Sequence, residues 1–175
     1  MKIKFLLLFV VAFGFNSLQA QEFPKVDVSP MDAVIVRTDN NQSFMRVIYS
    51  RPQKKGRNIF GDLVPYGKVW RTGANEATEI TFYKDVEFGG KTLEAGTYSL
   101  FTIPNKDKWT VIINEDVNLW GAYQYDSSKD VVRVEVNPKT TAATVETFSI
   151  TSKKADKGYH LLLGWDDTYV EVPVY

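Results

Sequence analysis

Apolar and polar residues alternate with a period of two over most of the chain. Val132, Val134 and Val136 are separated by Arg133 and Glu135, and several other runs follow the same pattern. Side chains on a β-strand point to opposite faces in turn, so each run can place one face on a core and the other in solvent. The pattern predicts antiparallel strands throughout, with no helical stripe of useful length after the first 20 residues.

Short turn signals divide these runs into about nine or ten strands. The signals are Asn40-Asn41, Gly89-Gly90, Pro104-Asn105, Asn137-Pro138 and Asp166-Asp167. Gly89-Gly90 predicts a two-residue hairpin, which requires positive φ. Asp166-Asp167 predicts a turn between separate strands at 159–165 and 169–174. So many strands in one domain predict an all-β fold, an antiparallel β-sandwich with jelly-roll-like connections.

The first 20 residues have the layout of a secretory signal peptide. Lys2 and Lys4 precede an apolar run from Phe5 to Phe15, and the small residue Ala20 marks the expected cleavage site. An apolar run of about eleven residues is too short to cross about 30 Å of hydrocarbon. We therefore expect residues 1–20 to be a signal peptide and residues 21–175 to form a single β-sandwich domain. We expect the protein to be periplasmic or secreted.

Composition narrows the possible chemistry. The chain has no cysteine and a single histidine, His160, so disulfides and cysteine nucleophiles are excluded and a zinc site lacks ligands. His160 lies opposite Leu161 and Leu163 in the alternation, which predicts a half-exposed strand residue. Without Lys2 and Lys4 the chain has 19 basic and 21 acidic residues, which gives no broad basic field for nucleic acid. We predict no catalytic residues, no metal, no cofactor and no nucleic-acid partner.

One long irregular segment, from Arg51 to Ala77, interrupts the strands. It holds six basic residues against two acidic ones and interleaves them with Phe60, Tyr66 and Trp70. Loops of this length without secondary structure are uncommon unless they are functional or disordered, and the aromatic residues argue against disorder. We call residues 51–77 the basic-aromatic loop and predict that it forms a working surface.

The run from Tyr49 to Phe82, YSRPQKKGRNIFGDLVPYGKVWRTGANEATEITF, resembles a bacterial family known as domain of unknown function 2911. Further matches are GTYSLFTIP at 96–104, WTVIIN at 109–114, WGAY at 120–123 and ETF at 146–148. The likeness extends from about Ser29 to Val174. It implies an exported single-domain protein. It implies no activity, so it carries over no catalytic residues.

Binding is the chemistry that the loop favours. Arg71 offers a planar fork for a carboxylate, sulfate or phosphate, next to the aromatic face of Trp70. The segment WGAYQY at 120–125 is a second aromatic cluster, suited to stacking on a sugar ring. The predicted ligand-binding residues are Arg51, Lys55, Arg57, Tyr66, Trp70, Arg71, Asn75, Glu76, Trp120 and Tyr123. We predict that alanine at Trp70 or at Arg71 weakens ligand binding without lowering thermal stability much.

Two other functions stay open. In a structural or protein-interaction domain of the cell envelope, the loop arginines would pair with loop carbonyls or with Glu76 and Glu79. In a carboxylate-dependent hydrolase, Glu76 and Glu79 would be the acid and base, although a strand places neighbours of that spacing on opposite faces. The sequence favours an exported binding module for a small anionic or acidic-sugar ligand, and it leaves room for a protein partner.

Overall fold

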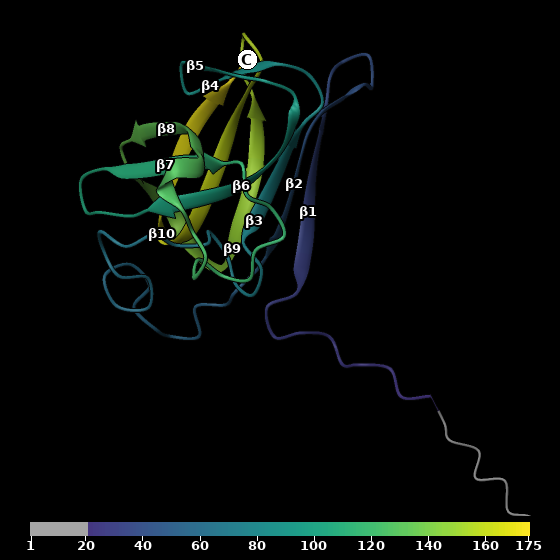
Figure 1. Ribbon diagram of the computed structural model, residues 1–175. Coiled ribbons are helices and arrows are strands. Elements are labelled where there is room, and N and C mark those ends of the chain that lie inside the picture. Colours follow the sequence, from purple (N-terminus) through teal and green to yellow (C-terminus); the bar gives the residue numbers. More distant parts are fainter. Residues whose placement is uncertain (1–20) are drawn as a thin grey trace, which may run out of the picture.

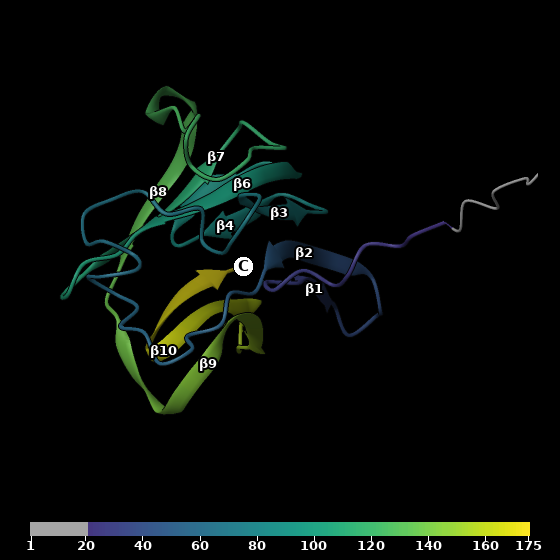
Figure 2. The same cartoon turned by 90° about the horizontal axis from the view of Figure 1, so that it is seen from below.

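The computed structural model describes residues 21–175, so the predicted signal peptide lies outside the described residues. Ten strands form two antiparallel sheets that pack face to face, as the two layers in Figure 1 and Figure 2 show. Helical structure in the described part is limited to η1 (Ser127–Lys129), a single short 3-10 turn. The prediction of an all-β chain with two antiparallel sheets is confirmed.

The first sheet contains six strands in the order β1-β2-β3-β6-β7-β8. Their bounds are β1 (Met31–Arg37), β2 (Ser43–Ser50), β3 (Thr78–Phe82), β6 (Gly96–Ile103), β7 (Trp109–Asn114) and β8 (Asp130–Val136). Neighbours in this sheet follow one another along the chain, apart from the two strands that leave between β3 and β6. The connectivity of this sheet is therefore a meander.

The second sheet has the order β5-β4-β10-β9. Its strands are β4 (Val86–Phe88), β5 (Lys91–Leu93), β9 (Lys139–Lys154) and β10 (Tyr159–Val174). Gly89 and Gly90 join β4 to β5 with φ angles of 56° and 83°. Positive φ at both central residues confirms the predicted two-residue hairpin.

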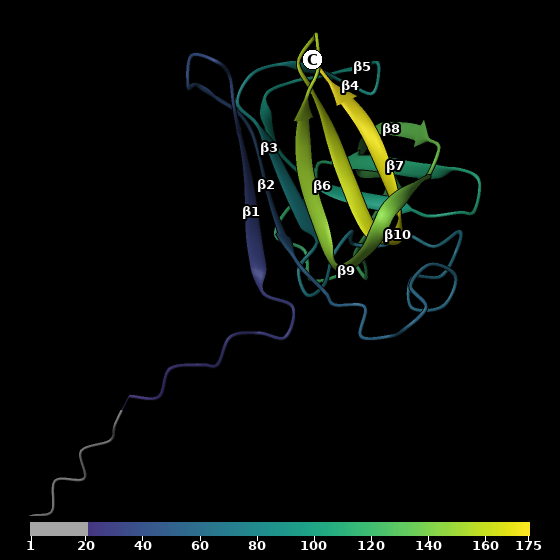
Figure 3. The ribbon, with the colours of Figure 1, turned by 180° about the vertical axis from the view of Figure 1, so that it is seen from behind.

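β10 folds back on itself. Eleven extended residues would separate His160 from Glu171 by more than 30 Å, yet the imidazole Nδ1 and the carboxylate Oε1 of this pair lie within hydrogen-bond distance. The chain therefore reverses at Asp166-Asp167, where Asp166 has a φ of 59°. The two arms, 159–165 and 168–174, lie antiparallel beside β9 in Figure 3. The predicted turn at Asp166-Asp167 is thus present, and it lies within β10.

The hydrophobic core fills the space between the sheets. Trp109 of β7 and Trp165 of β10 are 2% and 1% exposed, so both indole rings belong to this core. The Tyr49 hydroxyl of β2 crosses between the sheets, donating to the Ile150 carbonyl at 3.3 Å and accepting from the Ile150 N–H at 3.0 Å. A side chain from the opposite sheet thus satisfies the backbone N–H and carbonyl of Ile150 in β9.

Glu171 joins the two arms of β10 to the start of β9. Its carboxylate accepts hydrogen bonds from Lys139 and His160, and the Lys139 hydrogen bond is the larger cause that holds the pKa of Glu171 below its usual 4.5. A lowered pKa in the folded state means that the ionised carboxylate stabilises the fold above pH 4.5 and that this contribution disappears as the pH falls through the folded-state pKa.

We expect Glu171→Gln to remove this part of the acid sensitivity. In urea titrations, the wild-type protein should lose more unfolding free energy than Glu171→Gln between about pH 5 and pH 3. Glu135→Gln is the matched control, because Glu135 pairs with Lys108 in an exposed ion pair. Identical pH profiles for wild type and Glu171→Gln would show that this network contributes nothing to stability.

Candidate functional site

The basic-aromatic loop closes the end of the sandwich opposite the C-terminus (Figure 1). Although it is irregular, isolated bridges fasten it to the sheets, pairing Gln53 with Thr147 and Trp70 with Thr102. Both hydrogen bonds of the second bridge are short, at 2.8 and 3.0 Å. The loop is therefore held by the scaffold, as a binding surface requires.

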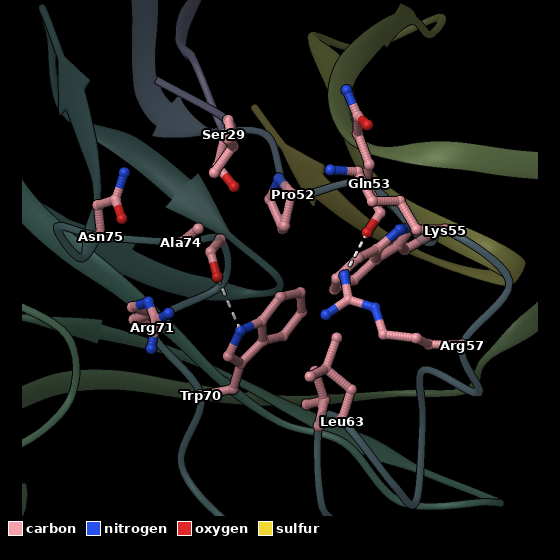
Figure 4. Close-up of a pocket in the computed structure, with 14 residues that line it drawn as sticks. Ser29, Pro52, Gln53, Lys55, Arg57, Leu63, Trp70, Arg71, Ala74 and Asn75 are labelled. Carbon is pink, nitrogen blue, oxygen red and sulfur yellow. Dashed lines mark hydrogen bonds between the residues drawn. The ribbon is translucent and has the colours of Figure 1, made fainter.

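A cavity of about 390 Å³ opens beneath this loop. Its lining residues, drawn as sticks in Figure 4, combine three cations, two tryptophans and several small polar groups. The lining residues are Val28, Ser29, Pro52, Gln53, Lys55, Arg57, Leu63, Val64, Trp70, Arg71, Gly73, Ala74, Asn75 and Trp165. Neither aspartate nor glutamate is among these lining residues, so the charge of the cavity wall is positive. We call this space the cationic cavity.

Of the two arginines that line the cavity, Arg71 has the less complete hydrogen bonding. Its Nε atom is buried and has no hydrogen-bond partner within residues 21–175, and the guanidinium forms no ion pair there. Figure 4 places Arg71 on the opposite side of Trp70 from Arg57. A buried polar group without a partner is costly, so an incoming acceptor would relieve that cost.

The backbone next to Arg71 is in an unusual conformation. Thr72 has a φ of 56° and is fully buried, and a β-branched residue rarely adopts this left-handed region. Hydrogen bonds hold it there: the Thr72 hydroxyl lies 3.1 Å from that of Thr102, and the Thr78 hydroxyl donates to the Thr72 carbonyl at 2.6 Å. Such outliers persist only where the surroundings enforce them, and they concentrate at functional sites.

Trp70 forms the floor of the cavity and belongs to the core at the same time. It is 8% exposed, stacks on Trp165 at 5.9 Å between ring centroids, and meets Phe148 and Phe60 edge to face. Its indole N–H donates to the Gly73 carbonyl at 3.0 Å. The burial of Trp70 argues against the expectation that Trp70→Ala leaves stability nearly unchanged. That expectation had no periodic pattern to draw on, because Trp70 lies in an irregular loop.

Arg51 and Arg57 are already occupied with other contacts. Arg51 does not line the cationic cavity, because its guanidinium bonds to Asp32 at 2.9 Å, to the Phe148 carbonyl and to the Ser149 hydroxyl. Arg57 does line the cavity, but it donates to the Gln53 and Lys54 carbonyls. Arg51 therefore fastens the loop to β9, and Arg57 contributes mainly its charge.

The remaining predicted residues fall into separate places. Lys55 lines the cationic cavity with an exposed side chain, while its backbone N–H donates to Glu146. Tyr66 lines a different cavity, of about 430 Å³, together with Asp166. Tyr123 is 83% exposed and lines none of the cavities described here. The structure thus does not bring Tyr66 and Tyr123 to the cationic cavity.

Trp120 lies next to the cationic cavity although it is remote in sequence. The segment around Trp120 pairs with the end of the loop: the Gly121 N–H donates to the Asn75 carbonyl at 3.0 Å, and Glu76 and Trp120 form a β-bridge. Asn75 and Trp120 line a neighbouring cavity of about 300 Å³. The second aromatic cluster therefore contributes Trp120, which is 60% exposed.

Tyr125 anchors the segment that carries Trp120. Its hydroxyl donates to Asp130 at 2.6 Å and accepts from Arg133 at 3.0 Å. Burial, together with the hydrogen bond to the Asp130 carboxylate, raises the pKa of Tyr125 to about 12. The tyrosine stays neutral at all physiological pH values, so the anchor of this segment does not change with pH in that range.

Glu76 and Glu79 face a common hollow of about 240 Å³ on the outer side of the first sheet. The expected placement on opposite faces is wrong, because Glu76 precedes β3 and does not follow the alternation of that strand. Neither carboxylate pairs with Arg57 or Arg71 in the described part of the chain, and Glu79 instead accepts from the Asn118 N–H at 2.7 Å.

Within residues 21–175, no group of three or more potential metal-binding side chains converges on one point. The same residues contain no helix with the length and hydropathy needed to span a membrane.

Comparison with known families places the chain. Residues 29–174 match the family described as "Protein of unknown function (DUF2911)". The chain belongs to this family. Comparisons of this DUF2911 chain with curated proteins and with solved structures found no significant match.

Several residues that line the cationic cavity were not predicted from the sequence. Ser29 comes from the segment before β1, Pro52 and Gln53 begin the loop, and Trp165 comes from β10. Trp165 continues the alternation of Leu161 and Leu163, which does not show which end of the core its side chain reaches. A local sequence signal for Ser29 is absent, since its place depends on contacts between distant segments.

Proposed function

We propose that this DUF2911 protein is an exported binding module that holds a small carboxylate, or another compact oxyanion such as an acidic sugar, in the cationic cavity. The single observation that carries the proposal is Arg71, with a buried and unpartnered Nε at the wall of a cavity that no carboxylate lines. A guanidinium presents two parallel donors that match two oxygens of a carboxylate.

The composition of the cavity supports this ligand class. Its volume of about 390 Å³ lies in the range of small-molecule sites, which are mostly apolar with a few well-placed polar groups. Lys55 and Arg57 add positive charge at the rim, and Trp70 and Trp165 supply apolar surface. An anion would gain charge-assisted hydrogen bonds without meeting a competing carboxylate.

The strained Thr72 supports Arg71 as the principal contact. A left-handed, β-branched residue costs on the order of 1–3 kcal/mol. The hydrogen bonds that enforce this conformation also hold the backbone of the preceding residue, Arg71. The Arg71 side chain therefore starts from a fixed position. Pre-organised donors lose less conformational entropy on binding than mobile ones do.

The proposal is tested by NMR titration of the isotope-labelled protein spanning residues 21–175. Hexanoate and glucuronate are the probes, and the side-chain Nε–H of Arg71 and the indole N–H of Trp70 are the reporters. We expect at least one probe to shift both signals in a saturable way, and Arg71→Ala to weaken its binding about tenfold or more, since hydrogen bonds to charged groups contribute about 1.5–3 kcal/mol.

Arg37→Ala is the matched control for this titration. Arg37 lies in β1 and bonds to Asn41 and Ser43, away from the cavity. The control should bind the probes as tightly as wild type does. The unfolding free energy of Arg71→Ala should lie within about 0.5 kcal/mol of the wild-type value, because the Arg71 guanidinium makes no hydrogen bond to the protein that would be lost. If neither probe moves the Arg71 signal, or if Arg71→Ala binds as well as wild type, the proposal is wrong.

A further inference from the structure

A second cavity, lined by residues of opposite charge, adjoins the cationic cavity. The neighbouring cavity, of about 300 Å³, shares Ser29 and Asn75 with it, so the two cavities meet at these residues. The second cavity is lined by Asp27 and Glu76, and its lining residues include neither lysine nor arginine. We call it the acidic cavity.

The two carboxylates of the acidic cavity keep free acceptor capacity. The Asp27 Oδ1 accepts from the Ser29 N–H at 2.7 Å and from the Asn75 amide at 3.2 Å. The side chain of Glu76 has no hydrogen bond and no ion pair among residues 21–175. Neither carboxylate therefore meets a protein cation, and negative charge accumulates a short distance from Arg71.

Trp120 adds an aromatic face to the same cavity. It is 60% exposed, and the β-bridge between Glu76 and Trp120 fixes its backbone beside the carboxylate. An exposed indole face with carboxylates around it suits an ammonium group, because the ring quadrupole and the carboxylates attract the same charge.

We propose that the ligand is a zwitterion, an amino carboxylate with its carboxylate at Arg71 and its ammonium group at Trp120, between Asp27 and Glu76. This inference rests on the proposed function, since it keeps the anion at Arg71, and it adds a second charge to the ligand. A ligand that spans the two cavities would pass the shared residues Ser29 and Asn75.

The test compares probes that differ only at the end remote from the carboxylate. Butanoate, pentanoate and hexanoate are titrated beside their terminal hydroxy and terminal amino analogues, with the indole signals of Trp70 and Trp120 as reporters. At the best-fitting length, we expect the amino acid to bind at least about threefold more tightly than the alkanoate and the hydroxy acid. The Trp120 signal should shift with the amino acid alone.

Glu76→Gln separates this inference from the proposed function. The variant should lose the advantage of the amino group while binding the plain alkanoates as wild type does. Glu87→Gln, an exposed carboxylate on β4 of the other sheet, should keep the advantage.

The remaining outcomes are also decisive. If alkanoates bind through Arg71 but the amino group adds nothing, or adds as much in Glu76→Gln, the zwitterion is wrong and the anion site stands. If the hydroxy acids bind most tightly, the acidic cavity recognises hydroxyl groups, as for a sugar acid, and the zwitterion is again wrong. If no alkanoate binds, both the proposed function and this inference fail.

Discussion

Replacing Trp70 by alanine is expected to destabilise the protein by about 3–5 kcal/mol, the usual cost of removing a buried tryptophan. Trp70 packs between the loop and the core, with Trp165 stacked at 5.9 Å and Phe148 at 5.0 Å. Its indole N–H satisfies the Gly73 carbonyl, so the substitution also leaves that buried acceptor without its donor. The melting temperature should fall on the order of 10 °C.

Trp120→Ala is the matched control, because it removes the same side chain from a site that is 60% exposed. We expect it to change the unfolding free energy by less than about 0.5 kcal/mol. Urea unfolding followed by far-UV circular dichroism measures both variants against wild type. Equal stabilities for Trp70→Ala and Trp120→Ala would contradict the core position of Trp70.

The same pair of variants bears on how binding data are interpreted. Loss of ligand affinity in Trp70→Ala does not identify a direct contact, because the loop that carries Arg71 depends on Trp70 for its anchorage. Loss of affinity in Trp120→Ala does identify one, since the fold is expected to survive. Arg71→Ala and Trp120→Ala are therefore the informative variants for the two cavities.

The strands could be predicted from the sequence because each one has a local signal. Val132, Val134 and Val136 mark β8 by alternation, and Gly89-Gly90 and Asp166-Asp167 mark turns through residues that tolerate positive φ. These signals extend over only a few residues, because the side chains of a strand alternate between its two faces and a turn needs only one or two special residues. The order of the strands in the sheets involves distant contacts, and the meander of the first sheet was not specified by any local pattern.

The candidate site could be predicted only in part, and two arginines of one loop show why. Arg51 and Arg71 look alike in sequence, yet Arg51 is occupied by Asp32 and Ser149, and Arg71 has no such partners. The partners of Arg51 lie 19 and 98 residues away, so only the fold reveals them. Trp70 was ambiguous for the same reason, because an irregular segment has no periodicity that separates buried from exposed positions.

Replacing Gly158 by alanine is expected to destabilise the protein by about 2–5 kcal/mol, from two separate costs. Gly158 has a φ of 70°, and an L-residue in this left-handed region costs about 1–2 kcal/mol. An added Cβ would also lie 2.3 Å from the Val174 carbonyl oxygen and 2.9 Å from the Tyr175 Cα. Overpacking of this kind costs about 1–3 kcal/mol more.

The end of β10 cannot easily move to relieve this contact. The Tyr175 N–H and carbonyl both bond to Glu87 at 3.0 Å, and the Gly89 N–H donates to the Pro173 carbonyl at 2.8 Å. A shift of the Val174 carbonyl would therefore weaken the pairing of β10 with β4. The contact involves backbone atoms, whose positions are set by the sheet and not by a side-chain rotamer.

Gly56→Ala isolates the backbone cost. Gly56 has a φ of 69°, nearly the same as Gly158, but an added Cβ meets nothing within 4 Å there. Its substitution should therefore cost about 1–2 kcal/mol, from the left-handed conformation alone. The difference between the two variants, measured by urea unfolding, then reports the contact with Val174. Equal losses would mean that the two arms of β10 do not approach each other as closely as the fold-back at Asp166-Asp167 requires.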